Sequence, residues 1–197
     1  MAVTDIIVTP CRILYSAVGG TLPADTVAYD GAWGAGWTEL GYTKTPLTVK
    51  YEEDQIKHDI QEALAPVAAH IISKALELET TLAEFTGANL ALGMNATNTE
   101  TAAGADQPAK DTVDFGNSNA LTTRQWGFEG QYVDEDGDTF PIRIFVWKAV
   151  VMANAELSFG KSDSTGIPLH VDALMDLSQE AGEEFWQILK ITEEAAS

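Results

Sequence analysis

Between residues 125 and 147 the chain alternates apolar and polar side chains, and this pattern restricts its fold more than any other. Three aromatic residues share one parity and three polar residues the other: Trp126, Phe128 and Tyr132 against Gln125, Glu129 and Gln131. The acidic run DEDGD then precedes the apolar run TFPIRIFVW. Because successive side chains of a strand point to opposite faces, the pattern predicts a β-hairpin.

Comparable alternation predicts strands elsewhere, at 11–18, 47–51, 56–60, 70–78, 156–159, 167–173 and 185–191. Segment 55–64 also fits a helix that would end before Pro66. Beyond Leu78 the spacing between apolar residues lengthens, so that they fall on one face of a helix. This pattern predicts a helix over 81–93 that begins with a Thr81–Glu84 capping box and stops at Gly93. The expected fold is mainly β: a β-sandwich or small barrel of about eight strands with one flanking α-helix, forming a single domain over residues 1–197.

Strand 140–147 is apolar on both faces, apart from Arg143. One interpretation is a central strand between a second sheet and the helix. The other is that a neighbouring subunit covers one face.

Two segments are long for a compact domain. Residues 19–37 are rich in glycine and contain two tryptophans, and residues 93–120 have few large apolar side chains. We expect both to be mobile loops.

The formal charge of −19, from 11 basic and 30 acidic residues, excludes phosphate neutralisation as a primary activity. The single cysteine, Cys11, excludes an internal disulfide framework and fits a reducing cytoplasm. The first 18 residues contain no basic leader and are interrupted by Asp5, Pro10 and Arg12, so we expect neither a signal peptide nor a membrane span.

Residues with catalytic or metal-binding chemistry do not form a recognisable motif. Asp134, Asp136 and Asp138 copy the first positions of a calcium loop, but Thr139 and Phe145 stand where such a loop needs Gly and Glu, so an acidic turn with Gly137 is predicted instead. The three histidines, at positions 58, 70 and 170, lie far apart without a second ligand at metal spacing. We therefore predict no enzyme activity, no metal, no cofactor and no catalytic residues.

The order of several short segments resembles the major tail tube protein of long-tailed bacteriophages, over about residues 6–191. These segments are the first strand with the loop residues Gly20, Thr21 and Pro23, then WTELGYT at 37–43, ELETTLAEF, ANAELSFG, and IPLHVDALMD at 167–176.

The resemblance implies a structural virion protein that self-assembles into stacked, hexameric rings. The rings form the hollow tube through which double-stranded DNA passes without binding. The implied partners are further copies of the chain, the tape-measure protein, and the tail terminator and tip proteins. Assembly would take place in the cytoplasm of the bacterial host, without a membrane.

Two alternatives remain open besides a hydrolase with paired carboxylates. One is the tube protein of a related contractile injection or secretion system. The other is a β-sandwich module that binds a carbohydrate by stacking on Trp33, Trp37 and Trp126.

Overall fold

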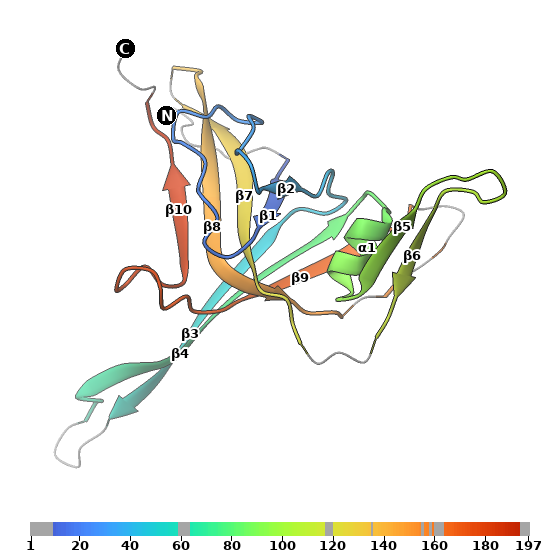
Figure 1. Ribbon diagram of the computed structural model, residues 1–197. Helices are drawn as coiled ribbons and strands as arrows, with labels where there is room; N and C mark the ends of the chain where they lie inside the picture. Colours follow the sequence, from blue (N-terminus) through green and yellow to red (C-terminus); the bar gives the residue numbers. More distant parts are fainter. Residues whose placement is uncertain are drawn as a thin grey trace.

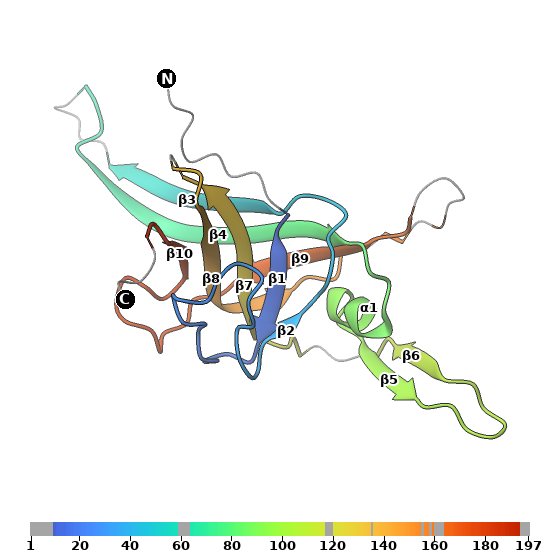
Figure 2. The same ribbon diagram turned by 90° about the horizontal axis from the view of Figure 1, so that it is seen from above.

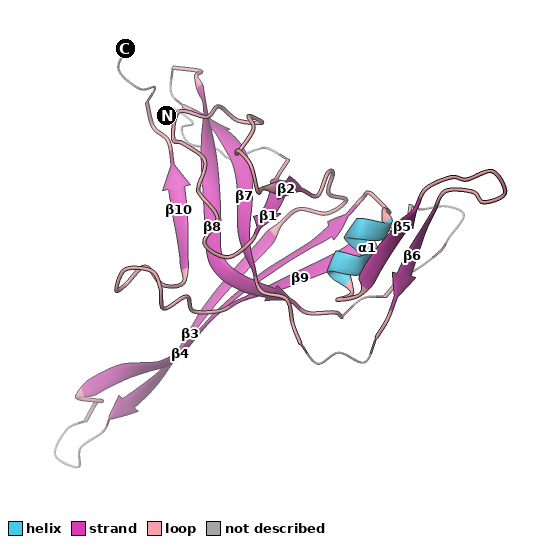
Figure 3. Cartoon of the chain, in the orientation of Figure 1, coloured by secondary structure: helices cyan, strands magenta, loops and turns pink. Residues whose placement is uncertain are grey.

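The computed structural model describes residues 10–58, 64–116, 120–134, 136–154, 156–157, 159 and 164–193. Within these residues the chain is mainly β, with one short helix (Figures 1 and 3). In chain order the elements are β1 (Arg12–Ser16), β2 (Thr38–Glu39), β3 (Thr48–His58), β4 (Ala68–Leu82), α1 (Gly87–Gly93), β5 (Thr97–Thr101), β6 (Lys110–Asp114), β7 (Arg124–Val133), β8 (Thr139–Val151), β9 (Ile167–Ala173) and β10 (Trp186–Lys190).

Strand β8 organises the main sheet, whose order is β2-β1-β7-β8-β9-β4-β3 with β10 also paired to β8. One edge of β8 pairs with β7, and the other edge is shared by two strands. Residues 142–146 pair with β10, and residues 149–151 pair with β9. Because β8 curves between these partners, β9, β4 and β3 pack over the other half of the sheet (Figure 1). The path is open and does not close into a barrel.

The predicted hairpin at 125–147 is confirmed as β7 and β8, and the two faces of β8 are covered differently. On one side lies the main core, formed by apolar residues of β1, β4, β7, β8 and β9. On the other side Phe145 and Trp147 pack with Leu14 and with Trp33 from the glycine-rich loop. That loop therefore takes the place expected for the helix or a neighbouring subunit over Phe145 and Trp147, whereas Ile142 and Ile144 of β8 stay partly exposed.

The helix begins later than predicted. Strand β4 continues to Leu82 because Thr81 and Leu82 pair with β9, and this tertiary pairing overrides the local capping pattern. The actual N-cap is Thr86, whose hydroxyl accepts a hydrogen bond from the Asn89 amide at 3.1 Å. Gly93 ends the helix as predicted.

Strands predicted at 47–51 and 56–60 form one continuous strand as far as residue 58, and residues 59–63 lie outside the described residues. The alternation restarts because the apolar side chains change face between Tyr51 and Ile56, so the helical interpretation is wrong for 55–58. The partner strand β4 contains a β-bulge: Asp54 pairs with Ser73 and Gln55 with Ile71, which leaves Ile72 as the extra residue.

Two further expectations need correction. Residues 156, 157 and 159 are not in a strand, whereas the segment expected to be one loop at 93–120 contains the β5–β6 hairpin. Polar β-branched threonines form much of this hairpin, so hydrophobic periodicity did not reveal it.

Candidate assembly surfaces

The β3–β4 hairpin projects beyond the body of the protein as a long arm (Figure 2). All of β3 and residues 68–75 of β4 are exposed. Among them Ile71 and Ile72 are 53% and 60% exposed. Because an isolated two-stranded hairpin is only marginally stable in water, this apolar surface indicates that another molecule covers the arm.

The register of β3 and β4 defines the two faces of the arm. We call the face that continues the buried positions Leu76 and Leu78 the inner face, and it includes Val49, Tyr51 and Ile71. The ring of Tyr51 contacts that of Trp186 from β10, with 5.7 Å between centroids. The inner face therefore begins in the core and runs out onto the exposed arm.

The opposite, outer face is strongly acidic and continues across β9. Register places five carboxylates on it against one lysine: Glu52, Asp54, Glu77, Glu79 and Asp172 against Lys50. Hydrogen bonding to Glu77, and then to Glu52, raises the pKa of Lys50 above its ordinary value. All three histidines also lie on this face, which the sequence spacing alone did not reveal.

Strand β3 is the last strand of the sheet, so one of its edges has no partner strand among the described residues. It is 11 residues long and exposed throughout. A long, exposed edge of this kind presents unpaired amides and carbonyls to which another chain can add a strand.

An apolar cavity of about 500 Å³ opens at the base of the arm. Its lining includes Cys11, Leu47, Val49, Phe128, Ile142 and Ile144. Burial raises the pKa of the Cys11 thiol to about 12, so the neutral thiol behaves as a small apolar side chain. The cavity and the inner face of the arm are therefore adjacent apolar surfaces, since Val49 belongs to both.

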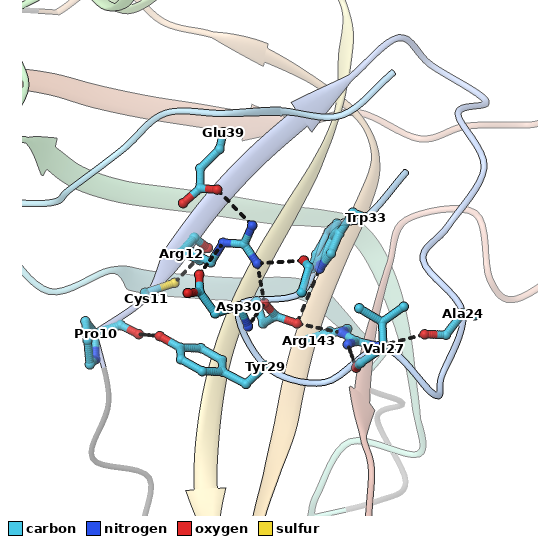
Figure 4. A network of polar contacts seen from close by, with 12 residues as sticks. Pro10, Cys11, Arg12, Ala24, Val27, Tyr29, Asp30, Trp33, Glu39 and Arg143 are labelled. Atoms are coloured by element: carbon cyan, nitrogen blue, oxygen red, sulfur yellow. Dashed lines mark hydrogen bonds and ion pairs between the residues drawn. The ribbon is translucent and has the colours of Figure 1, made fainter. Parts of the chain in front are cut away.

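A buried ion network holds the glycine-rich loop in place (Figure 4). Glu129 of β7 is fully buried and lies opposite Arg12 of β1 and Arg143 of β8. Its carboxylate accepts hydrogen bonds from Arg12 Nη1 at 2.9 Å and Arg143 Nε at 3.0 Å. From the loop, the Asp30 amide and Trp33 Nε1 donate to it at 3.2 and 3.3 Å.

Arg143 also donates to the backbone carbonyls of Ala24 and Val27, and Arg12 to that of Gly31. The network therefore ties the loop across three strands. Neither Arg12 nor Glu129 was singled out from the sequence, because Arg12 and Glu129 are 117 positions apart. The only sequence signal was Arg143, a charge inside an apolar strand.

The tryptophans proposed for carbohydrate stacking are not available as a platform. Trp126 is fully buried and Trp33 is 5% exposed, while Trp37 is partly buried against Trp33 at 5.0 Å between ring centroids. Asp134, Asp136, Gly137 and Asp138 lie in the predicted turn, and residue 135 is outside the described residues. Gly137 has φ +90°, and Asp134 Oδ1 accepts hydrogen bonds from the amides of Asp136 and Asp138 at 3.0 and 2.8 Å.

A comparison with protein families supports the resemblance seen in the sequence. The family model for phage tail tube proteins matches residues 4–194 of the 197-residue chain. The chain belongs to the phage tail tube protein family. It is therefore a structural component of the virion tail that associates with itself into a tube and with other tail components. A search of curated protein sequences found no match to this tail tube protein. Among the described residues no helix has the length and apolar character needed to cross a membrane.

Proposed function

We propose that this tail tube protein forms stacked rings of six subunits around a bore through which double-stranded DNA passes. The observation that carries the proposal is the β3–β4 arm, because its free edge and its exposed inner face both need a partner outside the subunit. Family membership makes a second copy of the chain the natural partner. Neighbouring subunits would join at the β3 edge and extend the sheet around the ring.

The outer face of β3, β4 and β9 would then line the bore. Its five carboxylates outnumber its one lysine, and a ring of six chains would carry roughly −114 formal charges in total. Like charges repel phosphates, so DNA would slide past this surface without binding sites that could retain it. Transit would require neither catalysis nor a cofactor.

The other proposed partners are the tape-measure protein inside the tube and the terminator and tip proteins at its ends, with assembly in the host cytoplasm. Mobility at 93–120, with ordering when the next ring docks, stays a proposal. At 19–37 the Glu129 network favours a loop that is already ordered in the free subunit. Amide exchange should then show residues 93–120 gaining protection in tubes, with residues 19–37 already protected in the free subunit. Equal protection of 93–120 in both states would remove that proposal.

The central test compares two substitutions on paired strands of the arm. Ile71→Asp places a charge on the inner face, whereas Ile56→Asp places the same charge on the outer face at nearly the same exposure in the subunit, 53% against 47%. We expect Ile71→Asp to leave soluble subunits and Ile56→Asp to form tubes. Negative-stain microscopy and sedimentation measure both outcomes.

Tubes formed by Ile71→Asp with the yield and diameter of the unmodified protein would refute a role for the inner face. Circular dichroism checks that both variants fold. Because both isoleucines are exposed in the subunit, neither substitution opens a cavity in the core.

A further inference from the structure

The outer face, which we propose lines the bore, holds a cluster of ionisable side chains from β4 and β9. Glu77 on β4 lies directly opposite Asp172 on β9, and Glu79 lies directly opposite His170. His170 and Asp172 are two residues apart on one strand and therefore share a face. The sheet thus fixes four ionisable side chains side by side, although two of them lie about 90 positions from the others in the sequence.

Three of these residues present ligand atoms to a common point. One ligand atom each from Glu77, His170 and Asp172 lies within 4.8 Å of the other two, and all three residues are partly buried. Asp172 Oδ1 is 2.8 Å from His170 Nε2. In a tetrahedral zinc site, bonds of about 2.0–2.2 Å place ligand atoms roughly 3.3 Å apart. Side-chain shifts on the order of 1 Å would therefore bring the three atoms to coordination distance.

The fourth residue, Glu79, orients the imidazole. Its Oε1 lies 2.9 Å from His170 Nδ1, on the opposite side of the ring from Asp172. A carboxylate that holds the Nδ1 proton is the usual outer-shell arrangement of histidine ligands, and a metal at Nε2 would replace the contact that Asp172 Oδ1 makes with this nitrogen.

Charge favours a divalent cation at this position. Three carboxylates surround His170, and the nearby cation is Lys50, which lies 3.3 Å from Glu77 Oε2. That contact leaves Glu77 Oε1 as a ligand. An imidazole nitrogen among the ligands favours zinc and similar transition metals over magnesium or calcium, which prefer all-oxygen sites.

We propose that Glu77, His170 and Asp172 bind one Zn²⁺ ion per chain, with Glu79 as the positioning residue for His170 and water in the fourth position. This site goes beyond the tube function and does not depend on it, since all four residues belong to one subunit. It revises the expectation, drawn from sequence spacing, that the chain has no metal ligands.

Titration calorimetry of the chelator-treated, full-length protein with zinc chloride tests the proposal. We expect one saturable site per chain. His170→Asn should weaken its affinity at least tenfold, and Glu79→Gln should weaken it by about 10- to 100-fold although Glu79 is not a ligand. The matched control is the double variant His58→Asn/His70→Asn, which removes two histidines of the same outer face, whose rings lie 4.9 Å apart, and should keep the site.

Cobalt(II) absorption of the unmodified protein gives a second measurement that needs no variant. A strong visible band, typical of four-coordinate cobalt, is expected. The absence of saturable zinc uptake, an unchanged affinity in His170→Asn, or only the weak band of six-coordinate cobalt would overturn the proposal. Loss of binding in the His58/His70 control alone would place the metal at the arm instead, and would also overturn it.

Discussion

Replacing Glu129 by glutamine should destabilise the subunit more than any surface substitution. The carboxylate is fully buried and accepts four hydrogen bonds, two from guanidinium groups and two from the glycine-rich loop. Glutamine keeps one acceptor oxygen and turns an amide group, itself a donor, toward the remaining donors. It also removes the negative charge beside Arg143, whose side chain is completely buried.

Removal of one partner from a buried ion pair costs about 3–5 kcal/mol. For a chain of this length, 1 kcal/mol corresponds to about 2–4 °C in Tm, so the loss should be roughly 6–20 °C. Urea denaturation followed by tryptophan fluorescence gives the free energy directly, and Trp33 reports on the loop that the network holds. The matched control is Glu100→Gln on the exposed surface of β5, which should change the free energy of unfolding by less than about 0.5 kcal/mol.

A double variant separates a lost charge pair from lost packing. Glu129→Leu combined with Arg143→Met removes both charges, so it should recover part of the loss. If Glu129→Gln unfolds within about 0.5 kcal/mol of the unmodified protein, the network does not anchor the loop and the reasoning fails.

Three further predictions concern single side chains. Gly127→Ala should destabilise the protein by about 1–3 kcal/mol, because an added Cβ would overlap the ring of Trp33; an unchanged urea midpoint would contradict this packing. Cys11 should react with a disulfide reagent roughly 30- to 60-fold more slowly than a thiol of pKa 9.0, because its pKa of about 12 lowers the thiolate fraction about 1,000-fold while the higher nucleophilicity of each thiolate offsets part of this; a folded-state rate within tenfold of the urea-unfolded rate would count against it. Hydrogen bonding from Ser178 lowers the pKa of Asp176, so this carboxylate contributes stability above pH 4 that is lost as the pH falls through its lowered pKa. The stability difference between Asp176→Asn and the unmodified protein should therefore be larger at pH 7 than near pH 2.5, and a constant difference would be the opposing result.

The alternation of apolar and polar residues predicted the strands that pack in the core. It did so because every second side chain of such a strand faces the core and is apolar. Ile167, Leu169 and Val171 of β9 are buried at alternate positions, as that pattern requires. Where strands leave the core, neither face is buried, and alternation no longer predicts which residues form one strand. On β3 the apolar residues change face, and one strand was interpreted as two.

The candidate sites depend on pairing between distant strands, which a single sequence does not specify. Glu79 meets His170 only because β4 and β9 are neighbours with that register. The capping pattern at Thr81 failed for the same reason, since pairing with β9 outweighed a local preference of about 1 kcal/mol. Local chemistry did succeed where nothing distant competed, as at the turn that contains Asp134 and Gly137.

The bulge at Ile72 sets the direction in which the arm projects. One unmatched residue bends and twists the ladder there, while the pairs on either side remain regular. Deletion of Ile72 would make Ser73 and Ile71 consecutive, opposite Asp54 and Gln55. Each of these cross-strand pairs would be kept, and the direction of the tip of the hairpin would change. If the arm joins neighbouring subunits as proposed, its direction can therefore change without a change in the pairs that hold the hairpin together.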